Sequence, residues 1–328
     1  MTRKQLSYVL FNALLAFSLA CGRKEQPFKI VLLPDTQVYS ESYPEIFRAQ
    51  TNWIVENKDS IVFVLQQGDI TNHNRPEQWE VAADALQRMD NIVPYALATG
   101  NHDNGENGHA QTRDLTYFNT YFPYDRYSKM PHFGGAMETG KLDNYWCHFK
   151  AGGLDWLVLN LEFGPRNSVL DWANEVVADH PKHRVIINTH AYMYSDETRM
   201  SSERSHHWLP QGYGLGKDSV DQVNNGEEIW EKLVRKHPNI LLVVSGHVLN
   251  DGVGTLVSEG DYGNNVYQML ANFQGGVDGS VNGGNGFLRI LTIDPANHTI
   301  DVKTYSPHID EYKTSAEHMF MFTDVKFN

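Results

Sequence analysis

Five apolar runs in the sequence each lead into a polar residue that can bind a metal or a phosphate. The runs are short and uncharged, which is typical of strands buried on both faces of a parallel sheet. They cover residues 30–33, 61–65, 93–98, 185–187 and 241–244. Between the first three runs, residues 44–58 and 76–90 repeat apolar side chains at helical spacing. This alternation predicts an α/β fold with a mostly parallel sheet covered by helices.

The second half of the chain predicts further strands and helices. We expect a hairpin that turns at Gly152-Gly153. A helix over residues 168–178 follows, in which Ser168 and Asp171 form a capping box. One more helix and three strands are predicted over residues 226–237, 266–270, 287–293 and 300–305. The three strands are expected to build a second sheet of more antiparallel character.

Two long segments, residues 105–140 and 195–225, show little periodicity. Structureless segments of this length in a compact domain are usually functional or disordered. Because the second one follows the strand that leads to His190, we expect it to wall the ligand crevice and to select the substrate. No linker or internal repeat marks a boundary, so residues 22–328 are expected to form a single domain.

The polar residues after the five apolar runs are carboxylates, amides or imidazoles in every case. They are Asp35, Asp69, Asn101-His102-Asp103, His190 and His247. Ligands of open α/β sheets bind beyond the carboxyl ends of the strands, so we expect these side chains to line one metal-binding crevice. Structural alternatives exist, with Asp35 as a helix N-cap or His190 as a core histidine. The glycine before His247 favours a close approach of the backbone to another group.

Composition narrows the functional classes. The chain has 328 residues and two cysteines, Cys21 and Cys147, which excludes a disulfide framework and a cysteine-based zinc site. The formal net charge of −13 argues against binding a nucleic-acid duplex, which requires clustered lysine and arginine. Anionic substrates are still compatible with this charge, because divalent cations held by carboxylates make a locally positive site.

The first residues predict export. Arg3 and Lys4 precede an apolar stretch, residues 6–20, that is too short to span a membrane comfortably. Cys21 follows at the position that bacterial lipoprotein signals lipidate, so we favour residues 1–21 as a lipoprotein leader over an ordinary signal peptide. We therefore expect the protein at a bacterial envelope membrane, periplasmic or on the cell surface, with the lipidated cysteine as its only membrane contact.

Taken in order, the motifs resemble those of the calcineurin-like metallophosphoesterase superfamily, in particular an exported bacterial branch with Asp-Thr-Gln in the first motif. The superfamily pattern is Asp-x-His, Gly-Asp, Gly-Asn-His-Asp/Glu, His and Gly-His-x-His. The motifs here are Asp35-Thr36-Gln37, Gly68-Asp69, Gly100-Asn101-His102-Asp103, His190 and Gly246-His247. The resemblance spans most of the mature chain and implies a four-layer α/β/β/α sandwich with a dinuclear metal site between the sheet edges.

The resemblance also implies a role for each motif residue. The metal ligands it implies are Asp35, Gln37, Asp69, Asn101, His190 and His247. The first two of these would bind the first cation, Asp69 would bridge both cations, and the last three would complete the shell of the second. His102 would stabilise the phosphoryl charge or protonate the leaving oxygen, and Asp103 would orient His102.

Two positions depart from the superfamily pattern, and both concern the first cation. Gln37 replaces a histidine and is either a ligand or a solvated loop amide. As a ligand, its oxygen would favour hard ions such as Mg²⁺ or Mn²⁺. Leu249 replaces the last histidine and cannot bind a metal, so Asn250 or Asp251 is expected to take its place. Two polar residues further on are interpreted only as turn residues, Asn272 and Gln274.

Together these motifs predict a metal-dependent phosphoesterase that hydrolyses a phosphate mono- or diester of a small molecule, lipid or glycan. Two divalent cations, of Mn, Mg, Zn or Fe, can clamp the attacking and leaving oxygens, and metal-bound hydroxide would attack phosphorus. The alternative is a catalytically silent metal-binding surface lipoprotein with the same fold, which Gln37 and Leu249 favour. A serine hydrolase is set aside because the sequence contains no Gly-x-Ser-x-Gly.

Overall fold

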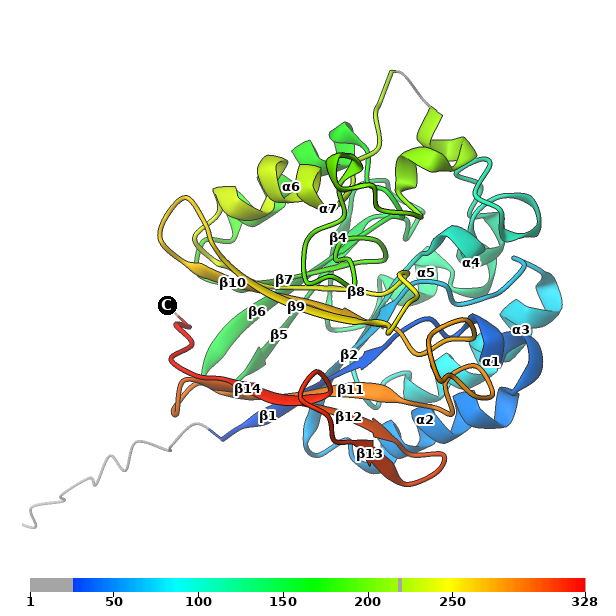
Figure 1. The fold of residues 1–328 in the computed structure, drawn as a ribbon, viewed down its shortest axis with the longest axis horizontal. Coiled ribbons are helices and arrows are strands. Elements are labelled where there is room, and N and C mark those ends of the chain that lie inside the picture. The colour runs from blue at the N-terminus through cyan, green and yellow to red at the C-terminus, as the bar shows by residue number, and fades with distance from the viewer. Residues whose placement is uncertain (1–25, 218–219, 328) are drawn as a thin grey trace, which may run out of the picture.

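Two stacked β-sheets with helices on their outer sides form the protein (Figure 1). The structure is a computed structural model and describes residues 26–217 and 220–327. The predicted leader, with Cys21, lies outside the described residues. Among the described helices, none has the length and apolar content needed to cross a membrane.

The first sheet has parallel strands at one end and antiparallel strands at the other. Its order is β13-β12-β11-β1-β2-β3, and β14 also pairs with β12. The parallel strands are β1 (Phe28–Leu33), β2 (Ile61–Gln67) and β3 (Tyr95–Ala98). The antiparallel strands are β11 (Leu288–Asp294), β12 (Thr299–Ser306), β13 (Glu311–Lys313) and β14 (Met319–Phe322).

In the second sheet the parallel strands lie between antiparallel ones. Its order is β4-β5-β6-β7-β8-β10-β9. The parallel strands are β6 (Leu154–Leu161), β7 (Arg184–Thr189), β8 (Ile240–Ser245) and β10 (Asn265–Ala271). The antiparallel strands on either side of them are β4 (Phe133–Ala136), β5 (Tyr145–Ala151) and β9 (Val253–Glu259).

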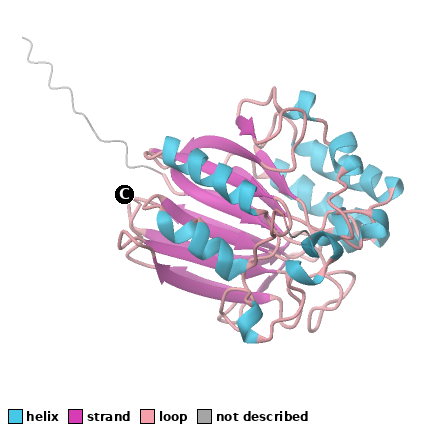
Figure 2. Ribbon diagram, turned by 90° about the horizontal axis from the view of Figure 1, so that it is seen from above, coloured by secondary structure: helices cyan, strands magenta, loops and turns pink. Residues whose placement is uncertain are grey.

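The helices complete a four-layer arrangement, which confirms the α/β/β/α prediction. Helices α6 (Asn167–Asp179) and α7 (Gly226–Lys232) cover the outer face of the second sheet (Figure 2). The remaining helices gather beside the first sheet (Figure 1). They are α1 (Gln37–Ser42), α2 (Pro44–Glu56), α3 (Pro76–Leu86), α4 (Thr116–Tyr121) and α5 (Tyr124–Tyr127).

Strand β6 is apolar along most of its length and does not alternate between apolar and polar residues. Trp156 and Val158 belong to the core that includes the first sheet, whereas Leu157 and Leu159 pack in the core under α6 and α7. All four are fully buried. Burying a side chain of this size contributes about 1.5–3 kcal/mol. The strand is therefore apolar on both faces because each face covers a separate layer.

Two predictions about the fold are wrong. Ser168 does not cap α6: the N-cap is Arg166, and the Ser168 hydroxyl donates instead to Asp221 Oδ2 at 2.5 Å. Strands β11 and β12 do not join β10 in the second sheet. They extend the first sheet, because β11 pairs with the edge of β1 that β2 leaves open.

Candidate metal centre

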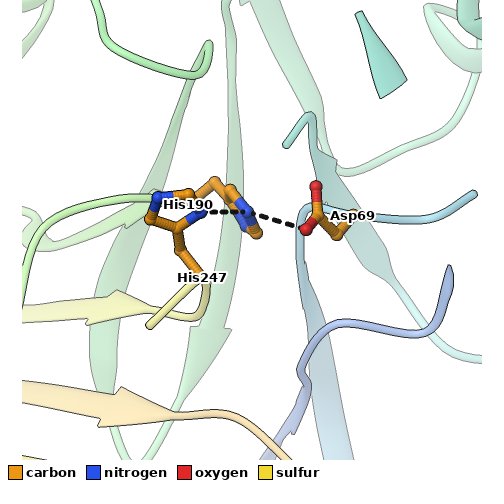
Figure 3. A group of neighbouring side chains, drawn as sticks. All are labelled: Asp69, His190 and His247. Atoms are coloured by element: carbon orange, nitrogen blue, oxygen red, sulfur yellow. Dashed lines mark hydrogen bonds and ion pairs between the residues drawn. The ribbon is translucent and has the colours of Figure 1, made fainter. Parts of the chain in front are cut away.

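The ends of five strands meet at one edge of the sandwich. Asp35, Asp69 and Asn101 follow β1, β2 and β3 of the first sheet, and His190 and His247 follow β7 and β8 of the second. All five side chains are buried. One carboxylate oxygen of Asp69 and one ring nitrogen of each histidine lie within 4.8 Å of one another (Figure 3). The structure thus brings the predicted strand-end residues of both sheets together.

Sharp backbone turns point these side chains into the crevice. Asp35, Asp69 and His247 have positive φ angles of 39°, 49° and 76°. This region is uncommon for residues other than glycine, and such strain clusters at functional sites. At Gly246 the constraint is space. A Cβ atom at this position would lie 1.9 Å from Asp35 Oδ1. The glycine therefore lets the β8 turn approach the Asp35 carboxylate.

Backbone carbonyls fix the tautomers of both histidines. His190 Nδ1 lies 2.8 Å from the carbonyl oxygen of Gln67, and His247 Nε2 lies 2.7 Å from that of Trp208. A carbonyl can only accept, so these two nitrogens carry the protons. His190 Nε2 and His247 Nδ1 are left facing each other at 3.1 Å. If both rings are neutral, their lone pairs point at each other, so this position suits a positive group that both nitrogens share, either a proton on His190 or a metal cation.

The electrostatics of the buried cluster favour positive charge beside Asp69. Burial opposes the charged form of His190, but Asp69 and Asp35 outweigh it and raise its pKa to about 9. Burial and the charge of His190 lower the pKa of His247 to about 3. Burial raises the pKa of Asp69, but His190 and His102 more than compensate, so its pKa falls below the usual range. The cluster accordingly stabilises a cation at this point.

Asn101 provides an independent indication of a metal. Its Oδ1 atom is buried and has no hydrogen-bond partner. An unsatisfied buried acceptor costs about 1–3 kcal/mol, so native structures rarely leave one without a ligand. Asn101 lines the same cavity as Asp69 and His247. Carboxylate and amide oxygen with two imidazole nitrogens is a donor set that suits Zn²⁺, Mn²⁺ or Fe²⁺, and the residues therefore fit a divalent cation.

Comparison with known proteins identifies the family. The sequence model of the calcineurin-like phosphoesterases matches residues 28–251. The chain belongs to the calcineurin-like phosphoesterase family. Members of this family are metal-dependent hydrolases of phosphoester bonds, and the predicted resemblance is confirmed.

Two known proteins are similar to this chain, one in sequence and one in fold. The uncharacterized protein YvnB of Bacillus subtilis (strain 168) is 32% identical over 294 residues, which are 87% of this chain and 20% of YvnB. The chain thus spans a fifth of the length of that relative. Among solved structures, the purple acid phosphatase PPD1 of yellow lupin (Lupinus luteus) has a TM-score of 0.56 at 14% identity. The match covers 91% of this chain and 54% of that one, and it shows a shared fold.

Relative to the calcineurin-like phosphoesterase pattern, the side of the centre around Asp35 is unusual. Asp35 accepts from the backbone N–H of His247 at 3.0 Å and from Gln274 Nε2 at 3.0 Å. Gln37 is fully buried, so it is not a solvated loop amide. Its Nε2 donates to Asp69 Oδ2 at 3.3 Å and also to Gln274 Oε1.

Gln274 is the site residue that the sequence interpretation missed. It was expected to be a turn residue, and no local signal distinguishes it. The two residues expected to replace the histidine missing at Leu249 are held elsewhere. Asn250 Nδ2 donates to Ser195 Oγ at 2.7 Å, and Asp251 Oδ1 accepts from the backbone N–H of Val253 at 3.3 Å. That prediction is wrong, and Gln274 lies beside Asp35 in their stead.

Asp103 does not orient His102, contrary to the expectation. The His102 ring is held by its Nδ1, which lies 2.7 Å from the carbonyl oxygen of Asn72. The carboxylate of Asp103 instead accepts three backbone N–H groups, from Gly100 at 2.8 Å, Thr71 at 2.9 Å and Ile70 at 3.1 Å. Asp103 therefore fixes the turns that carry Asp69 and Asn101.

A cavity of about 320 Å³ opens over the centre. His102 lines it, together with Trp208 and Tyr213 from the long segment after β7. That segment therefore walls the crevice as predicted, and Trp208 also holds His247 through its carbonyl. In the part of the chain that the structure describes, no lysine or arginine lines this cavity.

Proposed function

We propose that this protein is a metal-dependent phosphoesterase that hydrolyses a phosphate mono- or diester. The observation that carries the proposal is the convergence of Asp69, His190 and His247 on one buried point beneath an open cavity, which Asn101 lines with an unpartnered oxygen. These four residues would hold one divalent cation, and Asp35 with Gln37 would help to hold a second beside Asp69. When bound, the cations would supply an activated water and neutralise phosphoryl charge.

His102 is the residue we assign to the leaving group. Its Nδ1 donates to the Asn72 carbonyl, so the ring is fixed and Nε2 is free to act in the cavity. Protonated Nε2 can donate to a phosphoryl oxygen or transfer its proton to the departing oxygen. Asp103 is a positioning residue, because it acts only through the turns that it holds.

The lining of the cavity bears on the substrate. With no lysine or arginine among the described lining residues, the charge of the substrate must be met by the cations and His102. This favours an ester with one reacting phosphoryl group over a chain of several phosphates. Trp208, Tyr213 and Leu249 offer apolar surface beside the reacting group, which suits a small-molecule, lipid or glycan ester with an uncharged substituent.

The second candidate is a metal-binding surface protein without turnover. It is favoured by one observation, the hydrogen-bonded amides of Gln37 and Gln274 on the side where the family has histidines. Export, lipidation of Cys21 and a single domain over residues 22–328 belong to either proposal and stay predictions.

Turnover of model esters separates the two candidates. Purified protein loaded with Mn²⁺, Mg²⁺ or Zn²⁺ would be assayed on p-nitrophenyl phosphate and bis-p-nitrophenyl phosphate. We expect His102→Ala to lower kcat by roughly 10²–10⁴-fold, the usual contribution of general acid catalysis, with unchanged metal content. The matched control is His109→Ala, which removes an exposed histidine outside the cavity. Equal rates for the two variants would refute the role of His102, and metal binding without any turnover would favour the second candidate.

A further inference from the structure

The two halves of the candidate centre offer different donor atoms. On one side, His190 Nε2 and His247 Nδ1 supply nitrogen. On the other side, the side-chain amides near Asp35 are those of Gln37 and Gln274, and no imidazole of the described residues is hydrogen-bonded to Asp35. Asp69 Oδ2 faces both halves, at 3.2 Å from His190 Nε2 and 3.3 Å from Gln37 Nε2. A cation in each half would thus share Asp69 but have a different second set of ligands.

Gln274 is held rigidly against Asp35. It lies in the loop after β10, it is buried, and it lines the cavity over the centre. Asn272 Oδ1 accepts from the backbone N–H of Gln274 at 3.0 Å, and Asn272 Nδ2 donates to the Val248 carbonyl at 3.2 Å. Asn272 therefore ties Gln274 to the loop that follows His247. The side chain has a fixed position rather than that of a mobile turn residue.

The side-chain amides of Gln37 and Gln274 lie where several oxygen atoms gather, a position that favours a positively charged group. The Nε2 of Gln37 donates to Asp69 Oδ2 and to Gln274 Oε1, so oxygen atoms from two directions converge on it. The Oε1 atom of the same amide is buried and has no hydrogen-bond partner. Half a turn about the last side-chain bond exchanges this nitrogen and oxygen. The Gln37 Oε1 atom then faces Asp69 Oδ2 and Gln274 Oε1, and these oxygens no longer share the N–H groups of the Gln37 amide, so a cation would have to compensate them.

We propose that Gln274 is a ligand of the first cation, and that the centre is built for two different cations. The half with Asp69, Asn101, His190 and His247 suits a transition metal such as Zn²⁺. The oxygen-only half suits a hard cation, Mg²⁺ or Mn²⁺. This inference rests on the proposed metal centre and goes beyond it by assigning Gln274 and the pairing of metals.

Metal titration tests the inference without any activity assay. Metal-stripped protein would be titrated with Zn²⁺ by calorimetry, and its metal content measured after dialysis. We expect one tightly held zinc per chain. Mn²⁺ added to the zinc-loaded protein should then fill one further site, with the electron paramagnetic resonance spectrum of an isolated Mn²⁺ ion in an oxygen environment.

Variants of Gln274 show whether it is the ligand. Gln274→Leu should keep the zinc and weaken Mn²⁺ binding by at least about 10–100-fold, the loss that follows removal of a group that only orients a ligand. Retained zinc also shows that the variant is folded. Gln274→Glu should retain or tighten Mn²⁺ binding, and Gln87→Leu, a glutamine that bonds to Tyr121 outside the centre, should change nothing. Leu249→His should let Zn²⁺ enter the first half.

The outcomes that contradict each proposal differ. Two zinc ions bound equally tightly by the wild-type chain, or Mn²⁺ binding that survives Gln274→Leu undiminished, would overturn the mixed-metal inference alone. Absence of any tight zinc site would overturn the metal centre itself, and with it the proposed phosphoesterase.

Discussion

Three residues of the centre keep a backbone conformation that their side chains disfavour, and hydrogen bonds from neighbouring turns hold them there. Asp69 Oδ1 accepts the backbone N–H of His102 at 2.9 Å, and Asp35 Oδ2 accepts that of His247 at 3.0 Å. Each aspartate therefore has a positive φ angle itself and accepts a hydrogen bond from the backbone of another turn of the site. At the residue scale the centre is therefore a set of interlocked turns, and a change of one atom at a turn should disturb its partners.

Gly246→Ala is the sharpest single-atom test of this interlocking. The added Cβ would lie 1.9 Å from Asp35 Oδ1, so the buried carboxylate must move. We expect a loss of about 1–3 kcal/mol in the free energy of unfolding, typical of overpacking, and weaker metal binding. The control is Gly212→Ala, where a Cβ would meet no atom within 4 Å. Calorimetric metal titration and urea unfolding would measure both, and identical results for the two variants would contradict the argument.

Asp103→Asn tests the positioning role of Asp103. Each carboxylate oxygen accepts two donors, and the amide NH₂ of asparagine would face backbone N–H groups whichever way it turned. Leaving such groups unsatisfied costs about 1–3 kcal/mol, so we expect that loss of stability together with weaker metal binding. Asp171→Asn, at an exposed position on α6, serves as control. Loss of turnover with unchanged stability and metal affinity would instead favour a direct chemical role.

At the element scale, the sequence predicted what depends on local pattern. Strand β1 covers Phe28–Leu33 and includes the predicted run 30–33, whose apolar residues are buried on both faces. Features set by distant partners could not be predicted. Gln274 donates a hydrogen bond to Asp35, which is 239 residues away in sequence, and the Ser168 hydroxyl donates to Asp221, which is 53 residues away. The strand-end residues of the candidate site could be predicted because parallel strands deliver their ends to one edge, whereas Gln274 follows a strand without any motif.

The segment before β4 carries a buried histidine with a predictable effect on stability. His132 packs against the rings of Phe63, Tyr95 and Tyr127, and burial lowers its pKa to about 4. In the unfolded chain the pKa of His132 is about 6.5. Below that pH the unfolded state binds a proton on His132, whereas in the folded state this histidine stays neutral. Stability is complete above pH ~6.5 and falls as the pH approaches 4, by up to about 3 kcal/mol.

His132→Phe should remove this pH dependence, because phenylalanine fills the space without titrating. Urea unfolding at pH 7 and pH 4.5, with EDTA present throughout, would give the difference in free energy for each variant. His109→Phe, at an exposed position, should keep the wild-type dependence. A His132→Phe protein that loses as much stability on acidification as wild type would show that other groups cause the loss.

At the scale of the whole molecule, the metal centre joins the two sheets at one edge. Asp69 and Asn101 come from the first sheet, and His190 and His247 from the second. A hydrogen bond also connects the two sheets: Asn188 Nδ2 on β7 donates to the backbone carbonyl of Gln66 on β2 at 2.9 Å. A cation bound by both sheets therefore acts as a cross-link that exists only in the folded state, and its binding free energy adds to the stability of the fold.

Removal of the metal should consequently lower the melting temperature of the whole protein. A cation present at 100 times its Kd stabilises the folded state by about 2.7 kcal/mol, and each kcal/mol shifts Tm by roughly 2–4 °C in a large domain. We expect EDTA to lower Tm by roughly 5–10 °C, and Zn²⁺ to restore it. His190→Ala should abolish the response, since the cation then loses its ligand from β7, whereas His180→Ala, at the end of α6, should preserve it. If wild type melts at the same temperature with and without the cation, the two sheets are not joined through a metal, and the centre must be explained by its internal hydrogen bonds alone.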